Sequence, residues 1–222
     1  MKNKIITAQQ AVDLIPDGAT IMMGGFVGCG SALSIIDALS KSNKGHFHTI
    51  HNDSSKLNGP DGDEYYSWAK MIHNGQIEGY IGSHLGTNPE AVEKWANGEL
   101  KVDLVPQGSL AEMIRAVITP TGVGTLVEDS PLVRGKVNYD GKDYLVMKPL
   151  RADVALIGAY KADKAGNVWY KGSAQNFNRV MATAADLVIV EAEELVEVGE
   201  IEPENVMTPG ILVNYIVVRE GK

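Results

Sequence analysis

The sequence predicts an α/β fold, built as an open, mostly parallel sheet with helices on both faces and a β-hairpin-rich excursion. Short apolar runs alternate with amphipathic segments of helical length along most of the chain. Such alternation is typical of a parallel sheet covered on both faces. The pattern of residues changes after Thr119. Within the stretch that follows, Asp140-Gly141 separates two segments with strand-like composition. Asp-Gly is a strong hairpin signal, so we expect one domain over residues 1–222 with a β-rich excursion at about 119–148.

The expected elements follow from local signals. Thr7-x-x-Gln10 matches a capping box and predicts the first helix. A segment rich in Gly, Pro and Asp, residues 56–63, predicts a loop, and the acidic residues 191–204 predict a solvated face. We expect helices at residues 8–15, 31–42, 64–72, 89–95, 109–116 and 176–185. We expect strands at residues 20–24, 47–51, 77–81, 102–105, 152–160, 168–170, 187–190 and within 210–218.

Composition narrows the class of protein. With 44% hydrophobic residues in 222, the chain can bury a sizeable core. A net charge of −8 without local basic patches argues against nucleic acid as a partner. The single cysteine, Cys29, excludes an internal disulfide and fits a reducing compartment.

The N-terminus, MKNKIITAQQ, has neither a long apolar core nor a cleavage site of small residues, so it does not predict a signal peptide. No apolar run approaches the roughly 20 residues that a membrane-spanning helix needs. We therefore expect a soluble, cytoplasmic protein that does not associate with a membrane. Metal-ligand spacings such as Cys-x-x-Cys are absent, and we expect no metal.

A glycine-rich stretch is the most informative part of the chain. A turn at Asp17-Gly18 precedes the apolar run Ile21-Met22-Met23, and Ser31 then begins a helical pattern. Glycines admit a ligand close to the backbone, and a helix N-terminus offers unpaired N–H groups. This order predicts a loop that binds a phosphate or another anion; the alternative is a tight turn without a ligand. The seven residues of the loop are Gly24, Gly25, Phe26, Val27, Gly28, Cys29 and Gly30.

Two amide residues follow predicted strands. Asn52 comes after the strand at 47–51, and Gln107 comes after the strand at 102–105. Ligands of open parallel sheets lie beyond the carboxyl ends of the strands, so both side chains are expected in one crevice beside the glycine loop. There they could hydrogen-bond an acyl carbonyl or a carboxylate. Alternatively, they only close turns.

The stretch from Asp17 to Gly30 resembles the signature of the family I coenzyme A transferases, and more narrowly the α subunit of the two-subunit acetate/acetoacetate/butyrate type. The resemblance covers almost the whole chain. In two places the chain departs from the family: Ala32 stands where the signature has proline, and only Ala116-Val117-Ile118 separate Arg115 from Thr119, where relatives have a glycine-rich stretch. Further resembling segments are Ser83 to Pro89, Val105 to Gly108, Thr119 to Thr125, Leu150 to Ile157, Asn176 to Asn178 and Met207 to Gly210.

The resemblance implies a transfer of coenzyme A between an acyl-CoA and a free carboxylate. It implies that a glutamate in a Ser-Glu-Asn-Gly-like motif of a partner β subunit is the nucleophile, and this sequence contains no such motif. We therefore expect no catalytic residue in this chain and a hetero-oligomer, α2β2 or higher. The resemblance assigns CoA binding to the glycine loop and substrate positioning to Asn52 and Gln107. Acyl-CoA is then a substrate, and no cofactor is bound permanently.

Two other functions compete with this interpretation. Gly28-x-Gly30 after a strand, with Asp53 after the next strand, suggests an NAD(P)-dependent dehydrogenase, although Leu33 replaces the third glycine of that fingerprint. A non-catalytic acyl-CoA-sensing domain would share the fold, and the short connection after Arg115 favours it.

Overall fold

The structure is a computed structural model, and it describes residues 3–60, 62–115, 118–119 and 122–219. Within these ranges no helix is both long and apolar enough to cross a bilayer. The expected short connection after Arg115 and the Thr-Pro-Thr-Gly segment fall largely outside the described residues.

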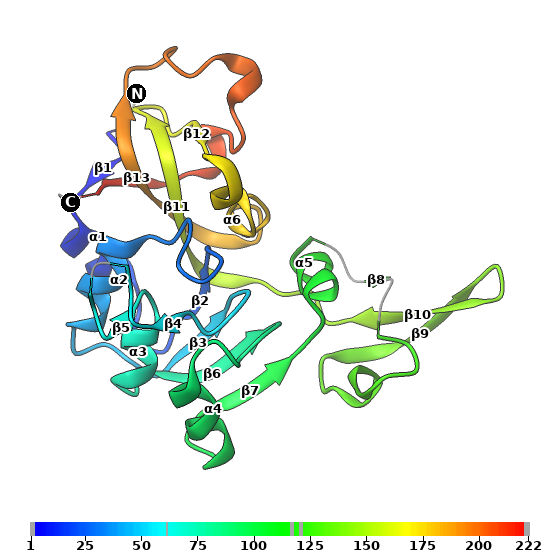
Figure 1. Cartoon of the computed structure of the whole chain (residues 1–222). Helices are drawn as coiled ribbons and strands as arrows, with labels where there is room; N and C mark the ends of the chain where they lie inside the picture. The colour runs from blue at the N-terminus through cyan, green and yellow to red at the C-terminus, as the bar shows by residue number, and fades with distance from the viewer. Residues whose placement is uncertain (1–2, 61, 116–117, 120–121, 220–222) are drawn as a thin grey trace.

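A large sheet organises the body of the molecule (Figure 1). Its neighbouring strands all run parallel along the main path, and only β12 (Val168–Trp169) pairs antiparallel, with β11. The predicted parallel sheet is therefore confirmed. In spatial order the strands are β1 (Ile5–Ile6), β14 (Tyr215–Val218), β13 (Ala185–Val196), β11 (Ala152–Asp163), β2 (Thr20–Met23), β3 (Phe47–Ile50), β6 (Ile77–Gly82) and β7 (Lys101–Leu104).

Helices cover both faces of this sheet, as predicted. Alternate residues of the strands feed two cores: Met22 of β2 packs into one, while Ile21 and Met23 pack into the other. Helices α1 (Ala8–Leu14), α2 (Leu33–Ser40), α3 (Ala69–His73) and α4 (Pro89–Ala96) contribute to the second core. Helices α5 (Gln107–Arg115) and α6 (Asn178–Met181) contribute to the first core.

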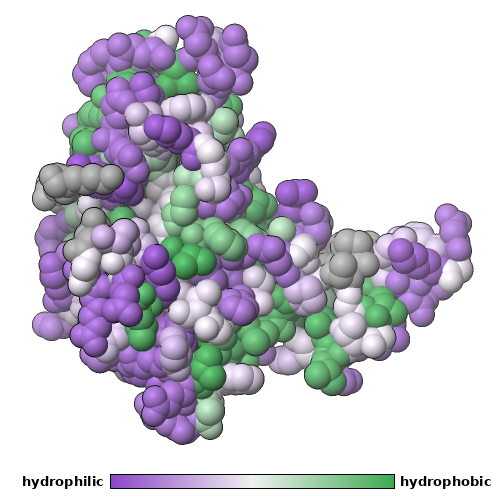
Figure 2. Space-filling view, viewed as in Figure 1, coloured by the Kyte–Doolittle hydropathy of each residue, from purple (hydrophilic) through white to green (hydrophobic). Residues whose placement is uncertain are grey.

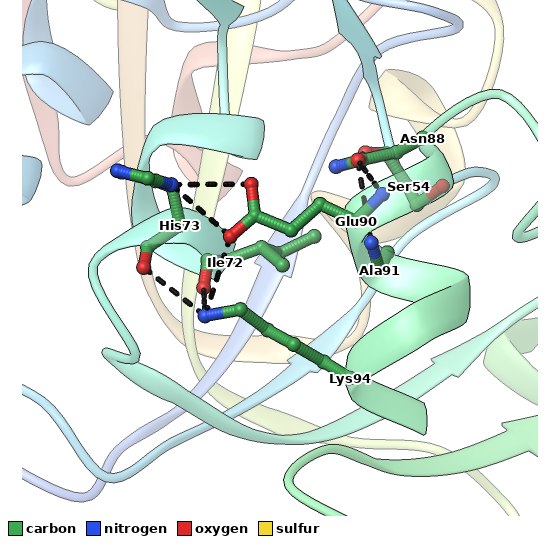
Figure 3. Close-up of polar contacts among 7 residues, drawn as sticks. All are labelled: Ser54, Ile72, His73, Asn88, Glu90, Ala91 and Lys94. Atoms are coloured by element: carbon green, nitrogen blue, oxygen red, sulfur yellow. Dashed lines mark hydrogen bonds and ion pairs between the residues drawn. The ribbon is translucent and has the colours of Figure 1, made fainter. Parts of the chain in front are cut away.

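Helix termini show why these segments are helical. The capping box predicted at Thr7 is present, with the Thr7 and Gln10 side chains bonded to each other's backbone N–H. Asn88 caps α4 by accepting from the N–H groups of Glu90 and Ala91 (Figure 3). One turn later Lys94 donates to the carbonyl oxygen of Ile72 at the end of α3, which joins the two helices.

A second, antiparallel sheet forms an arm that projects from the body (Figure 1). We define the arm as β8 (Ile118–Thr119), the 3-10 turn η1 (Leu126–Asp129), β9 (Val133–Tyr139) and β10 (Lys142–Met147). Asp140 and Gly141 both have positive φ, of 51° and 79°, as a type I′ hairpin turn requires. The hairpin expected there is confirmed. Figure 2 shows apolar residues on the lower part of the body and on the underside of the arm.

Several local predictions are wrong or only partly right. Residues 64–72 do not form one helix, because Ser67 has φ of 52° and interrupts it; β5 (Tyr65–Tyr66) instead pairs with β4 (Lys56–Leu57) in a segment predicted to be loop. The helix after the glycine loop begins at Leu33, and no side chain caps it at Ala32.

The acidic face predicted at 191–204 is confirmed for six of its glutamates and is wrong for Glu191; the exposed ones are Glu193, Glu194, Glu197, Glu200, Glu202 and Glu204. Strand β13 continues to Val196, paired with β11, and the side chain of Glu191 is fully buried. Beyond it lie the short turns η3 (Pro203–Asn205) and η4 (Gly210–Leu212).

Candidate functional site

The glycine loop lies at the point where the strand order of the sheet reverses. Strand β2 has β3 on one side, and from there the chain proceeds outward through β6 to β7. On its other side β2 pairs with β11, and the order proceeds outward through β13 to β14. In open parallel sheets this switch point, at the carboxyl ends of the strands, is where ligands bind. The loop after β2 therefore occupies the position that the fold favours for a site.

The loop is a tight turn with an exposed tip. Phe26 and Cys29 exchange two backbone hydrogen bonds of 2.9 Å, and the residues between them, Val27 and Gly28, have φ of 48° and 85°. The Phe26 side chain is 49% exposed. Phe26 and Cys29 therefore form the accessible part of the loop, while Gly24, Gly25 and Gly28 are buried.

The space above the glycines is filled by the protein itself. A Cβ on Gly24 would lie 1.6 Å from Asn178 Oδ1, and one on Gly28 would lie 1.9 Å from a ring carbon of Tyr66. Gly25 is similarly close to Ser31 Oγ, at 2.3 Å. These close contacts are sufficient reason for glycine at the three positions, and no ligand is needed to account for them. The binding role of the loop stays a prediction that depends on its position and its exposed tip.

The N-terminus of α2 is not an open anion site. The carboxylate of Glu191 accepts from the N–H of Ile35 at 3.0 Å and from the Ser34 hydroxyl at 3.3 Å. Arg219 holds the same carboxylate with a 2.8 Å hydrogen bond from Nε, and its Nη2 donates to the carbonyl of Ser31. The chain thus supplies its own anion at the helix start, which corrects the expectation that those N–H groups await a ligand.

Asn52 and Gln107 come together as the topology predicts. Gln107 Nε2 donates to Asn52 Oδ1 at 2.6 Å, although Asn52 follows β3 and Gln107 follows β7. Asn52 is only 2% exposed, and its Nδ2 donates to Asp53 Oδ2. Gln107 is exposed at the first turn of α5. Of the pair, Gln107 can reach a ligand, whereas Asn52 is placed to orient the Gln107 amide.

Asp53 joins these amides to the glycine loop. Its Oδ2 accepts from the N–H of Val27 at 2.9 Å, and its Oδ1 accepts from the N–H of Ser55. Its side chain is 1% exposed, so both carboxylate oxygens are used inside the protein. A ribose-binding acid must present its carboxylate to a cofactor, and Asp53 does not.

A neutral histidine lies beneath this edge of the sheet. His51 is completely buried and makes T-shaped contacts with the rings of Trp68 and Tyr80, with ring centroids 4.9 and 4.7 Å away. Burial lowers the pKa of His51 from 6.5 to about 3. Its imidazole is therefore uncharged at neutral pH and supports the Asn52 segment by packing and by a 2.8 Å hydrogen bond with Thr49.

Two site residues were missed because their partners are distant in sequence. The helix predicted at residues 176–185 is shortened to the single turn of α6, and the 3-10 turn η2 (Gly172–Gln175) precedes it. Asn176, just after η2, and Asn178, at the start of α6, both hydrogen-bond to the glycine loop. The sequence signal for them is that Asn176-Phe177-Asn178 resembles a segment of the coenzyme A transferase family.

Comparison with known proteins identifies the family. Residues 5–219 match the family described as coenzyme A transferase. The chain belongs to the coenzyme A transferase family. It is 42% identical over 227 residues to the acetate CoA-transferase subunit alpha of Escherichia coli K12, covering 99% of both chains. It is 44% identical over 224 residues to the alpha subunit of the Clostridium acetobutylicum acetoacetyl-CoA:acetate/butyrate CoA transferase, covering 98% of each.

A solved acyl-CoA transferase has the same fold. The E. coli O157:H7 acyl-CoA transferase YdiF, solved as a thioester complex with CoA, superposes with a TM-score of 0.84 at 22% identity. The match covers 100% of this chain and 48% of YdiF, so the chain spans about half of that polypeptide. The family membership and the enclosed carboxylate of Asp53 together overturn the dehydrogenase alternative.

Proposed function

We propose that this chain is the α subunit of an enzyme that moves coenzyme A between a short-chain acyl-CoA or 3-oxoacyl-CoA and a free carboxylate of the acetate, acetoacetate and butyrate class. The observation that carries the proposal is the end-to-end match to two proteins named as alpha subunits of such enzymes. The sequence also lacks a Ser-Glu-Asn-Gly-like segment, so the nucleophile is assigned to a partner β subunit.

The chemistry divides one difficult exchange into steps. A glutamate carboxylate oxygen of the partner attacks the thioester carbonyl, and the carbon–sulfur bond breaks to give a mixed anhydride and CoA thiolate. The thiolate then attacks the glutamyl carbonyl and releases the donor acid, which leaves CoA on the enzyme as a thioester. The acceptor carboxylate repeats the sequence in reverse. Each attack develops an oxyanion that preorganised donors stabilise.

In this proposal the chain contributes binding and orientation. The exposed tip of the glycine loop, with Phe26 and Cys29, contacts the CoA carrier beside the switch point of the sheet. Gln107 directs its amide toward the acyl group or carboxylate, and Asn52 fixes that amide through the 2.6 Å hydrogen bond. An amide offers such hydrogen bonds without adding charge next to a carboxylate substrate.

The remaining properties follow as parts of the same proposal. The assembly is a hetero-oligomer of α and β chains, α2β2 or larger, and it works in the cytoplasm. Coenzyme A enters and leaves as a substrate and is not a resident cofactor. The whole of residues 1–222 acts as one domain with the arm as its excursion.

The test is reconstitution. The chain is purified with a β-type partner and assayed for exchange between acetoacetyl-CoA and acetate or butyrate, with each chain alone as the control. We expect transfer only in the mixture. Acyl-CoA binding by the complex without transfer to any of a panel of short acids would contradict the proposal and favour the non-catalytic acyl-CoA-sensing function.

A further inference from the structure

We propose that Asn176 and Asn178 are positioning residues, and that together they clamp the glycine loop in the conformation that binds the CoA carrier. The inference rests on the proposed function, because it gives the loop that ligand. Neither residue lies on the accessible tip, so their effect is exerted through the loop.

Asn176 bridges the two sides of the turn. Its Oδ1 accepts from the N–H of Gly25 at 3.1 Å, and its Nδ2 donates to the carbonyl of Cys29 at 3.0 Å. One side chain therefore fixes residues on both sides of the exposed tip. The same Oδ1 accepts from the N–H of Phe177 at 2.7 Å, which anchors the amide at its own end.

Asn178 fastens the end of the loop to the sheet. Its Nδ2 lies 2.8 Å from the carbonyl oxygen of Gly30, 3.1 Å from that of Gly158 in β11, and 2.7 Å from that of Ala174 in η2. Three separate segments thus converge on one amide group. The surrounding carbonyls also fix its orientation, because turning the amide over would bring its oxygen against them.

The other end of the Asn178 amide faces the start of the loop. Its side chain is completely buried, and among the described residues Oδ1 has no donor. That oxygen lies where a Cβ of Gly24 would be. An unpaired buried carbonyl oxygen costs stability, whereas an apolar side chain of similar size would not. What the asparagine provides in exchange is the set of hydrogen bonds from Nδ2 to Gly30, Gly158 and Ala174.

The break between η2 and α6 supports a role beyond packing. A continuous helix over residues 176–185 was expected from the sequence, and it would direct these side chains at intervals set by the helical turn. Instead residues 176–177 form a turn between η2 and α6, and the amides of Asn176 and Asn178 both bond to the glycine loop. The loop is contacted in this way at Gly25, Cys29 and Gly30.

The experiment compares three variants in the assembled complex. Asn176→Ala and Asn178→Ala each remove clamp contacts. Asn167→Ala is the matched control, because Asn167 Oδ1 accepts from the N–H of Gly210 at 2.9 Å in a loop elsewhere in the chain. Cys29 is the sole cysteine of this chain, so its labelling by N-ethylmaleimide, quantified by peptide mass spectrometry, reports on the loop directly.

We expect both clamp variants to label Cys29 roughly five- to tenfold faster and to raise the KM for acyl-CoA by a similar factor, since each loses hydrogen bonds that hold the loop. The KM for the free acid should be unchanged, and Asn167→Ala should match the wild type in labelling and in both KM values. Should Asn178→Ala fail to fold, Asn176→Ala decides. Wild-type labelling and KM values in Asn176→Ala would overturn the inference. If the wild-type complex transfers no CoA, the proposed function fails separately. If the clamp variants of such a complex still label Cys29 faster, the asparagines hold the loop but the loop lacks the proposed ligand. That result also overturns the inference.

Discussion

The glycine loop and the arm both leave the central sheet, yet their surroundings differ. In the loop, the backbone N–H groups of Gly25 and Val27 bond to side chains from distant parts of the chain, Asn176 and Asp53. In the arm, Leu126 is 89% exposed and Tyr139 is 54% exposed. Leu145 and Met147 bury the base of the arm in the core of the body. The side chains that hold the loop thus come from this chain, whereas the arm carries apolar side chains that the described residues leave exposed.

The largest expected effect concerns the buried charge behind the loop. Arg219→Ala leaves the fully buried Glu191 carboxylate without its cation and should lower the free energy of unfolding by about 3 kcal/mol. Urea unfolding measures it. Arg151→Ala is the control, because its ion pair with Asp186 is exposed on both sides and should contribute little. Equal losses in the two variants would contradict the account.

Acid should destabilise the region beneath the loop through His51. Its pKa is lowered by burial to about 3, so between pH 6.5 and 3 the unfolded chain binds one proton more than the folded chain. The free energy of unfolding then falls by about 1.4 kcal/mol for each unit of decreasing pH across that window. His51→Gln should remove this slope. Unfolding curves at about pH 6.5 and about pH 4.5 test it, and an unchanged slope in the variant would show that His51 is not buried neutral.

Gly24→Ala tests whether the loop is as closely packed as its contacts indicate. The new methyl group would lie 1.6 Å from Asn178 Oδ1, and overpacking of this kind costs about 1–3 kcal/mol. CoA transfer by the complex should fall with it. Gly141→Ala in the arm is a useful comparison, since its φ of 79° adds strain but its Cβ meets no other atom within 4 Å. Loss of CoA transfer in the arm variant alone would contradict the claim that the glycine loop is the closely packed region on which transfer depends.

Gln107→Ala should separate binding from stability. The residue is exposed, and losing its hydrogen bond to Asn52 should change the free energy of unfolding by no more than about 1 kcal/mol. The KM for the carboxylic acid should rise, because the amide that faces the substrate is gone. Steady-state kinetics measures both substrates, and a normal KM for the acid would remove Gln107 from the site.

The smallest expected effect lies in the arm. Leu126→Ser replaces a side chain that is 89% exposed, so the free energy of unfolding should stay within about 0.5 kcal/mol of the wild type. Thermal or urea unfolding of the variant checks this. A large loss would mean that Leu126 is covered in the native chain.

Much of the fold could be predicted from local signals. Apolar runs gave the parallel strands, Thr7 and Gln10 gave the first helix cap, and Asp140-Gly141 gave the hairpin. The position of ligand sites at the carboxyl ends of parallel strands predicts that Asn52 and Gln107 lie close together, as they do. Each of these depends on neighbours in sequence or on a general property of parallel sheets.

Two of the errors have a common physical origin. The sequence predicts an exposed Glu191 because a run of glutamates is typical of a solvated face. Its cation, Arg219, lies 28 residues away in the chain, so the local pattern does not show the ion pair. Asn178 meets Gly30 across a sequence separation of 148 residues, so a helical pattern could not show that its segment breaks. Where a long-range polar contact decides the local structure, periodicity and propensity are insufficient.

Locating the covalent intermediate tests the central claim most directly. The complex of this chain with its β-type partner is incubated with acyl-CoA alone, trapped, and both chains are analysed by peptide mass spectrometry. The account predicts a thioester or acyl adduct on a glutamate of the partner and none on this chain. An adduct on this chain would contradict the division of labour between a chain that holds the CoA carrier and a chain that attacks it.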